Sequence, residues 1–330
     1  MKKIYFITYD LTARGGISYY ARALIPALKK KEPNLVIIEL KQKNRWHRLA
    51  SLLVCSILAP KGALIISNHV NFLRAFAPLK RLKKFSLSAI TINREIEHPS
   101  VIPMLRKVDH LFPMFYHGQA RLEALGVPSE NISHINNILE QSGQPSTDIK
   151  PEHQFLVIAR LDKFDAKIKG FFYLLRALRQ CKNIRVVIAG SGDSKELLEA
   201  YCQRFNIQDQ VSFRGFVDDK EKISLMRAAS VFVHLSDGEG VPCITVMEAI
   251  EQGCRILVHD DPRGDVNRLV AKMPLVPVNR YKSSLLADTL RKEAKKQKSK
   301  TEITFAKAKN SINHYSAENV VKVIATKMGF

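Results

Sequence analysis

The sequence has few cysteines, a single tryptophan and no apolar run long enough to cross a membrane. Its five cysteines never form a C-x-x-C pair. Their spacing shows no disulfide framework and no zinc site, which predicts a reducing compartment. The longest apolar stretch, residues 49–59, is far shorter than the roughly 20 residues of a membrane-spanning helix. Residues 1–10 begin with a basic segment but end in an acid, which is typical of a first strand rather than of a signal peptide. We therefore expect a protein that is soluble or lies on a membrane without crossing it.

The charge of the chain is uneven. The 330 residues are 46% hydrophobic, which is globular composition, and their formal net charge is +21. Residues 1–110 have a balance of +14 and residues 280–309 a balance of +7, whereas residues 111–279 are close to neutral. A uniformly basic nucleic-acid-binding protein is not expected to leave half of its length uncharged. We therefore expect an anionic surface, and not a nucleic acid, to meet the basic segments.

Short apolar runs alternate with helical patterns along nearly the whole chain. In the first half, strands are expected at residues 4–9, 35–40, 63–67, 86–92 and 110–115, with helices such as 18–31, 45–58 and 119–125. After a break rich in turn-forming residues, strands are expected at 155–159, 184–189, 210–213, 231–235 and 255–258, and helices at 171–180, 195–205, 220–229 and 245–252. The alternation predicts an α/β protein with two tandem Rossmann-like, doubly wound parallel-sheet domains and an interdomain cleft.

The break at residues 141–151 is the best linker in the sequence, so the expected domains are residues 1–145 and 146–312. A last helix follows within residues 313–330, with Ser316 as its N-cap. Its predecessor, the basic segment 291–309, is expected to be a helix with a solvated face.

Glycine-rich turns follow strands in both halves. Gly15-Gly16 lies between the first strand and the first helix, where a backbone can approach an anion closely; a tight turn with positive φ is an equally good interpretation. Gly190-Ser191-Gly192 is a second turn of this kind, and its signal alone is weak. Arg160 follows a strand, and Lys169-Gly170 opens the next helix, so the two cations could converge on one diphosphate.

The segment from His234 to Gly253 is the richest in acids and glycines. Asp237 and Glu239 follow a strand, and Glu248 lies within the apolar helix that comes next. A carboxylate buried there needs a partner, and a ribose diol would supply two hydroxyl donors. The alternative is an exposed glutamate on an amphipathic helix.

In order and spacing, these motifs resemble the GT-B retaining glycosyltransferases of the GT4 type (glycosyl transferases group 1) over most of the chain. The matching segments are Gly15-Gly16, Arg160-Leu161, Lys169-Gly170, Gly190-Ser191-Gly192, Phe213–Val217, Ser236–Pro242 and Met247–Ile250. The resemblance implies that the second domain binds a nucleotide-sugar donor and the first domain binds the acceptor. It also implies that the last helix crosses back onto the first domain.

The resemblance assigns a role to each matching position. Arg160 and Lys169 would grip the donor diphosphate, and Glu248 would hold the ribose hydroxyls. Phe216 and Val217 would lie beside the base. The implied catalytic residues are Arg160, Lys169, Glu239 and His98. The implied nucleotide-sugar-binding residues are Gly15, Gly16, Arg160, Lys169, Gly190, Phe216, Val217, Glu239, Gly240, Val241, Pro242, Cys243, Ile244 and Glu248.

The sequence departs from the family pattern at three places. The Asn-Gly that the family has before the linker appears here as Asn136-Asn137, which keeps only the first residue. Relatives typically separate the two acidic residues by seven positions, whereas eight separate Glu239 from Glu248. Either the loop bulges, or the role of Glu239 passes elsewhere, for example to Asp237. Many relatives also have a histidine where this sequence has Asn93. His98 and His69 are the candidates here, although a lone histidine is more often a structural hydrogen-bonding residue.

The two candidate cations, Arg160 and Lys169, also indicate whether a metal cofactor is needed. Arg160, Lys169 and helix N-termini would stabilise the departing diphosphate, and no Asp-x-Asp motif follows a strand. We therefore expect no metal and no other cofactor. Same-face attack by the acceptor hydroxyl is what the resemblance implies for retention.

A basic and apolar segment in the first domain suggests a membrane. Residues 45–48 precede the apolar run 49–59, and residues 29–31 and 80–84 are also basic. Anionic lipid would attract them by about 1 kcal/mol per Lys or Arg. The alternative is an ordinary covering helix with a buried apolar face.

The sequence thus predicts a hexosyltransferase that moves a sugar, most simply from a UDP-sugar, to a hydroxyl of a lipid-linked or cell-surface glycan. It would work in the cytoplasm of a bacterium, peripherally on the inner face of the membrane, in lipopolysaccharide or capsule synthesis. The alternatives are a UDP-sugar 2-epimerase of the same fold and a basic, non-enzymatic membrane- or nucleic-acid-binding module.

Overall fold

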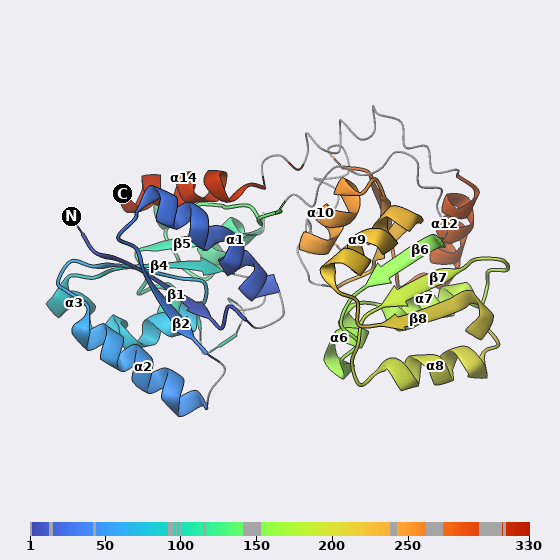
Figure 1. The fold of residues 1–330 in the computed structure, drawn as a ribbon, viewed down its shortest axis with the longest axis horizontal. Coiled ribbons are helices and arrows are strands. Elements are labelled where there is room, and N and C mark those ends of the chain that lie inside the picture. Colours follow the sequence, from blue (N-terminus) through green and yellow to red (C-terminus); the bar gives the residue numbers. More distant parts are fainter. Residues whose placement is uncertain are drawn as a thin grey trace. The chain divides into compact units, whose positions relative to one another are not determined.

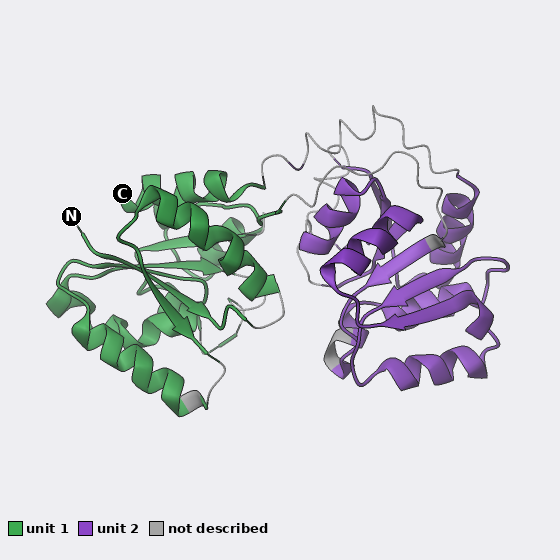
Figure 2. Cartoon of the chain, in the orientation of Figure 1, with its two compact units in different colours: residues 1–140, 314–330 green, residues 141–313 purple. Residues whose placement is uncertain are grey.

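The computed structural model describes residues 2–12, 16–41, 44–91, 96, 98–99, 101–114, 117–140, 153–237, 243–261, 273–296, 312 and 315–330. The chain forms two compact units, shown in different colours in Figure 2. Unit 1 contains residues 1–140 and 314–330, and unit 2 contains residues 141–313. The boundaries expected from the sequence were 145/146 and 312/313.

Unit 1 is built on a five-stranded parallel sheet with the order β2-β1-β3-β4-β5 (Figure 1). Its strands are β1 (Ile4–Tyr9), β2 (Val36–Leu40), β3 (Leu64–Ser67), β4 (Ser86–Thr91) and β5 (His110–Pro113). Its helices are α1 (Gly16–Lys31), α2 (Arg45–Leu58), α3 (Lys80–Lys83), α4 (Ile102–Leu105), α5 (Gly118–Ala124) and α14 (Ala317–Met328), and its 3-10 turns include η1 (Val70–Ala75).

Successive side chains of each strand in unit 1 point to opposite faces of the sheet, so they pack into two separate hydrophobic cores. Phe6 of β1 packs in the core that α1 and α14 cover, whereas Ile7 packs in the core under α2 and η1. The last helix, α14, lies beside α1. Ser316 caps it, because the Ser316 hydroxyl accepts a hydrogen bond from the Asn319 N–H at 3.2 Å. Helix α14 is therefore part of the first unit although 173 residues of unit 2 precede it in sequence.

Unit 2 is built on a six-stranded parallel sheet with the order β11-β10-β9-β6-β7-β8. Its strands are β6 (His153–Ile158), β7 (Val186–Ala189), β8 (Val211–Gly215), β9 (Ala229–His234), β10 (Arg255–His259) and β11 (Leu275–Val278). Its helices are α6 (Lys163–Ile168), α7 (Phe171–Leu178), α8 (Lys195–Arg204), α9 (Asp219–Ala228), α10 (Ile244–Glu251) and α12 (Ser283–Lys295). Helices α7, α8 and α12 pack on one face, and α9 and α10 contact the strands from the other.

Both sheets are parallel and covered by helices on both faces, which confirms the predicted fold class. Some elements differ from expectation. Helix α6 (Lys163–Ile168) was not predicted. Strand β11 was not predicted, because it has four residues and contains Pro277, which only an edge position tolerates well. The helix expected at 291–309 begins earlier: α12 starts at Ser283 and buries Leu286 and Leu290, and residues 297–309 lie outside the described residues.

Candidate functional site

The carboxyl ends of the strands of unit 2 lie at one edge of its sheet, where parallel α/β proteins place their ligands. Arg160 follows β6, and Gly190 follows β7. Phe216 follows β8, and Asp237 follows β9. The parallel sheet therefore gathers predicted residues that lie far apart in the sequence.

The loop that carries Arg160 is fastened to the glycine-rich turn after β7. The Leu161 N–H donates to the Ser191 carbonyl at 2.9 Å, and the Ser194 N–H donates to the Leu161 carbonyl at 2.8 Å. Gly190 has a φ of +147°, and a Cβ there would lie 1.8 Å from the Ala159 carbonyl oxygen. Glycine is thus required at 190 by the packing of two loops, whatever it does toward a ligand. The side chain of Arg160 is 74% exposed, with a long contact of 3.9 Å to the Asp162 carboxylate.

Lys169 and Gly170 form the turn between α6 and α7. Gly170 is the N-cap of α7 and has a φ of +76°. A Cβ at this position would lie 2.7 Å from the Leu235 carbonyl oxygen, so the turn fits closely against the end of β9. The Asp237 N–H donates to the Ile168 carbonyl at 2.9 Å. These contacts fix the backbone on both sides of the half-buried Lys169.

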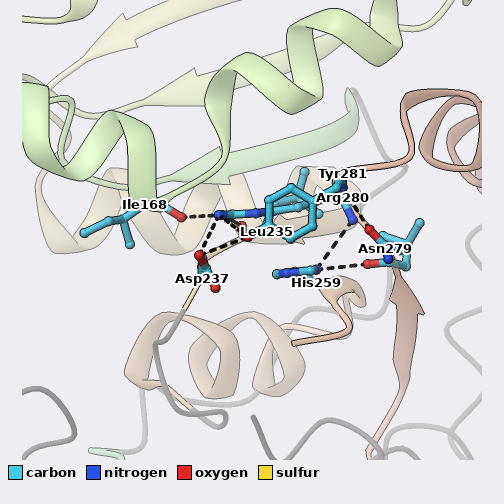
Figure 3. A network of polar contacts seen from close by, with 8 residues as sticks. Ile168, Leu235, Asp237, His259, Asn279, Arg280 and Tyr281 are labelled. Carbon is cyan, nitrogen blue, oxygen red and sulfur yellow. Dashed lines mark hydrogen bonds and ion pairs between the residues drawn. The ribbon is translucent and has the colours of Figure 1, made fainter. Parts of the chain in front are cut away.

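A buried arginine joins the same turn to the end of β9, as Figure 3 shows. Nη1 of Arg280 donates to the carbonyls of Ile168 and Leu235, each at 2.6 Å. Nη2 of Arg280 lies 3.1 Å from Oδ2 of Asp237, and the Tyr281 hydroxyl donates to the same oxygen at 3.0 Å. The carboxylate of Asp237 is therefore engaged by unit 2 itself, which does not favour Asp237 as a substitute for Glu239.

Glu248 is 4% exposed on α10, so the alternative of an exposed glutamate is wrong. Its Oε1 accepts a hydrogen bond from Nζ of Lys222 at 2.7 Å, and the same ammonium lies 2.9 Å from Oδ1 of Asp219. Oε2 of Glu248 is buried and has no hydrogen-bond partner among the described residues. Burial raises the pKa of Glu248, and Lys222 opposes this shift.

Lys222 was not singled out from the sequence. Burial lowers the pKa of this ammonium, but the contacts with Glu248 and Asp219 together outweigh burial, so the net shift is upward. Nothing in the sequence separates Lys222 from Lys220 two residues earlier. The only usable signal was the prediction that a buried Glu248 needs a partner.

Of the remaining donor-side predictions, those of unit 2 that the structure describes follow the carboxyl ends of β8 and β9. Phe216 is 53% exposed, and Val217 is half-buried. Cys243 is the N-cap of α10, and its Sγ lies 3.3 Å from Oγ1 of Thr245. Ile244 is the first residue of α10, where backbone N–H groups have no acceptor within the helix. Gly15, Glu239, Gly240, Val241 and Pro242 lie outside the described residues.

The first-domain candidates lie in unit 1. Gly16 is the first residue of α1; its φ is not in the left-handed region, and a Cβ there would meet nothing within 4 Å. Neither a positive φ nor packing therefore explains this glycine. His98 is exposed. His69 caps η1, since its Nδ1 accepts from the Asn71 N–H at 3.3 Å, and its ring packs against Tyr9 and Phe72. Asn93 is outside the described residues.

Two features are absent from the part of the chain that the structure describes. In it, no group of three or more His, Cys, Asp or Glu side chains is arranged to hold a metal ion. Nor does that part contain a helix with the length and apolar character needed to span a bilayer.

Comparison with known proteins supports the predicted resemblance. Residues 144–271 match the family model of the glycosyl transferases group 1. A phosphatidyl-myo-inositol mannosyltransferase of Mycolicibacterium smegmatis is 31% identical over 163 residues, which are 46% of this chain and 41% of the relative. This chain spans less than half of the length of the curated relatives that it matches.

Solved structures agree at the level of the fold. Anabaena Alr3699/HepE, crystallised with UDP and glucose, is similar over 100% of both chains, with a TM-score of 0.76 and 15% identity. The lipopolysaccharide outer core galactosyltransferase WaaB is similar over 99% of both chains, with a TM-score of 0.72 and 15% identity. Together with the family match, these structures confirm that the chain resembles the GT-B glycosyltransferases of group 1.

Proposed function

Because residues 144–271 match the glycosyl transferases group 1, we propose that this chain is a retaining hexosyltransferase that uses a nucleotide-sugar donor. The observation that carries the proposal is the edge of the second sheet: exposed Arg160 follows β6, the Lys169 turn contacts the end of β9, and buried Glu248 lies on α10, the next helix after β9. UDP is the nucleotide that we favour, because a protein of the same fold was crystallised with UDP and glucose.

The cations of this edge suit a departing diphosphate. Cleavage of the sugar–phosphate bond places negative charge on the diphosphate and positive character on the anomeric carbon. Arg160 can bind phosphate oxygens in a bidentate manner, Lys169 adds a point charge, and the first N–H groups of α10 add a helix N-terminus. These groups would be in place before the reaction, so in this proposal they perform the task that a metal ion performs in other enzymes.

The buried carboxylate suits a sugar diol. Lys222 holds Oε1 of Glu248 and leaves Oε2 without a partner among the described residues. A buried acceptor without a donor is costly. A ribose hydroxyl would donate to Oε2, so binding of the nucleotide would satisfy an atom that folding leaves unsatisfied.

The acceptor side of the proposal rests on helix α2. Six large apolar side chains in α2 are 41% to 75% exposed: Trp46, Leu49, Leu53, Val54, Ile57 and Leu58. In the alternative of an ordinary covering helix, this face would be buried. Among the side chains of α2 that the structure describes, only Leu52 and Ser56 are buried.

Basic residues accompany this apolar surface. Lys83 of α3 donates to the carbonyls of Ile57 and Ala59 at the end of α2, so the basic segment 80–84 lies next to it. Leu82 of α3 is 75% exposed. An exposed apolar face beside Lys and Arg side chains is suited to an anionic membrane surface. We therefore propose that unit 1 docks peripherally on the inner face of the cytoplasmic membrane, where it meets a lipid-linked or cell-surface glycan acceptor.

Arg160→Ala and Lys169→Ala test the donor site. UDP, GDP and ADP are first compared by the thermal shift that each produces, because a ligand of the native state raises apparent stability. With the nucleotide that shifts most, each variant is expected to bind about 10- to 100-fold more weakly, since each removes a charged hydrogen bond. Lys167→Ala, at an exposed neighbour on α6, is the matched control and is expected to bind normally.

Product analysis completes the test. Free nucleotide together with a glycoside that keeps the anomeric configuration of the donor supports retaining transfer. A changed sugar still attached to its nucleotide would instead identify an epimerase. Wild-type binding in both variants would refute the donor site.

A further inference from the structure

Arg280 is a buried cation that belongs to no predicted motif. It lies two residues after β11 and is 3% exposed. Its guanidinium contacts three acceptors on two separate segments: the Ile168 carbonyl before Lys169, and the Leu235 carbonyl and Asp237 carboxylate after β9. One side chain thus ties together two loops of the candidate site (Figure 3).

The surroundings of Arg280 are built for a guanidinium. The rings of Tyr173 and Tyr281 lie 5.0 and 4.9 Å from its Cζ, and Asp237 supplies the opposite charge. A planar fork can serve two carbonyls and a carboxylate at once, whereas a lysine ammonium cannot reproduce this geometry. Burial of the Arg280 guanidinium costs free energy, because a charge is removed from water, and these contacts offset that cost. The pairing of β10 with β11 is made by backbone contacts and does not require this arginine.

Each contact of Arg280 lies next to a residue that is proposed to bind the donor. Ile168 immediately precedes Lys169, and Asp237 lies two residues before Glu239 in sequence. The backbone at Gly170 is closely packed. A Cβ there would collide with the Leu235 carbonyl and approach Nη1 of Arg280 to 3.3 Å. A change in the guanidinium would therefore displace the backbone of the Lys169 turn.

From this geometry we propose that Arg280 is a positioning residue for the donor diphosphate, because it holds the Lys169 turn against the end of β9. The inference rests on the proposed function. It adds a residue outside the motifs of the sequence, and Arg280 acts through Lys169 rather than by touching the donor.

A double-mutant cycle tests whether Arg280 acts through Lys169. The variants are Arg280→Lys, Lys169→Ala and their combination. Two ligands are compared: a nucleoside diphosphate and the matching nucleoside. The diphosphate is UDP, unless GDP or ADP produces a larger thermal shift of the wild-type protein. Arg280→Lys is expected to weaken binding of the diphosphate about tenfold, because a small misplacement of a binding group is costly. Affinity for the nucleoside is expected to stay unchanged, and the combined variant is expected to bind like Lys169→Ala alone.

Arg255→Lys is the matched control for a purely structural effect. Arg255 is another arginine of unit 2 that pairs with a carboxylate, since its Nε donates to Oε2 of the buried Glu293 at 2.9 Å. The Arg255→Lys variant is expected to be less stable than the wild type but to keep its affinity for the nucleoside diphosphate. If Arg280→Lys does not fold, Tyr281→Phe takes its place, because this variant removes the hydroxyl that bridges Nη2 of Arg280 and Asp237. Tyr281→Phe is likewise expected to weaken binding of the nucleoside diphosphate.

The outcomes separate this inference from the proposed function. If the wild type binds none of the three diphosphates, both fail. If Lys169→Ala weakens binding but Arg280→Lys or Tyr281→Phe does not, only the role of Arg280 is refuted. Additive losses in the combined variant, or an equal loss for the nucleoside, would show that Arg280 stabilises the fold in general and does not position Lys169.

Discussion

Helices α2 of unit 1 and α10 of unit 2 depart from ordinary side-chain burial in opposite directions. On α2, Trp46 is 71% exposed and Ile57 is 63% exposed, whereas on α10 the carboxylate-bearing Glu248 is 4% exposed. Helix α2 leaves apolar surface in water, and α10 removes a charged group from water; folding alone favours neither. Under the proposed function, this difference corresponds to two kinds of partner, an anionic membrane surface at α2 and a hydroxyl-bearing ligand at α10.

The two departures also differ in how the fold accommodates them. Glu248 is compensated within unit 2 by Lys222 of α9, which approaches it to 2.7 Å. The apolar side chains of α2 are not covered in the same way, although Leu52 of the same helix is fully integrated in the core. We therefore expect a change at the carboxylate to alter the stability of unit 2, and a change at the exposed apolar positions of α2 to cost unit 1 little.

The largest expected effect is on the Lys222–Glu248 pair. Lys222→Met leaves the buried carboxylate without its cation, and we expect it to lower the free energy of unfolding by about 3–5 kcal/mol. Replacing both residues, with Lys222→Met and Glu248→Leu, is expected to restore most of that stability and to abolish nucleotide binding. Urea denaturation and nucleotide thermal shifts measure the two effects.

Lys195→Met is the control for that experiment. Lys195 and Glu199 form an exposed pair at 3.4 Å on α8, so losing it is expected to cost no more than about 1 kcal/mol. A loss in Lys222→Met as small as in this control would show that Glu248 does not depend on Lys222.

The next prediction compares a buried and an exposed leucine that are neighbours in α2, Leu52 and Leu53. Leu52→Ala opens a cavity in the core and is expected to cost about 2–5 kcal/mol. The double variant Leu53→Gln/Ile57→Gln changes only exposed positions, so its stability is expected to stay within about 0.5 kcal/mol of the wild type. The double variant is nevertheless expected to lose flotation with vesicles that contain phosphatidylglycerol, whereas wild-type flotation rises with anionic lipid and falls with salt.

Leu197→Gln is the control for the vesicle experiment, because Leu197 is 57% exposed but lies on α8 of unit 2. It is expected to float like the wild type. The membrane proposal fails if neutral and anionic vesicles behave alike, or if Leu53→Gln/Ile57→Gln floats as well as Leu197→Gln.

The sequence predicted the sheets well because buried parallel strands are continuous apolar runs, which are easy to recognise. The strand at Ile4–Tyr9 and the helix at Arg45–Leu58 have the predicted bounds. Periodicity could not tell which face of α2 is covered, because an apolar stripe is the same in the sequence whether protein, lipid or water meets it. The motifs likewise located Lys169 but not the arginine that holds its turn.

Arg280 and Lys222 were missed for a common reason. Each acts through a contact with a residue distant in sequence: 112 positions separate Arg280 from Ile168, and 26 separate Lys222 from Glu248. A single basic residue carries no local pattern that distinguishes a buried, paired cation from a solvated one. Only the packing of α9 on α10, and of the loop after β11 on the Lys169 turn, makes that distinction.

The smallest expected effect concerns acid sensitivity. Among the described residues, each unit has one buried histidine whose pKa is lowered. Burial lowers the pKa of His110 in unit 1, and Lys327 lowers it further. Burial also lowers the pKa of His259 in unit 2, with a further contribution from Arg280 against an opposing hydrogen bond to Val278. A histidine whose pKa is lower in the folded protein than the ordinary 6.5 contributes stability above pH 6.5 and loses it as the pH falls through the folded value.

We therefore expect the free energy of unfolding to fall between pH 7 and pH 5, by at most about 1.4 kcal/mol per pH unit for each histidine. His110→Asn and His259→Asn each remove one contribution, so each variant is expected to have a shallower pH dependence than the wild type. Denaturant melts at several pH values, followed with probes in each unit, assign the two contributions. Equal slopes in the wild type and in His259→Asn would show that His259 binds protons equally in the folded and unfolded protein, so that its pKa is not lowered by folding. In that case, acid sensitivity would belong to unit 1, because His110 would be the remaining buried histidine with a lowered pKa among the described residues.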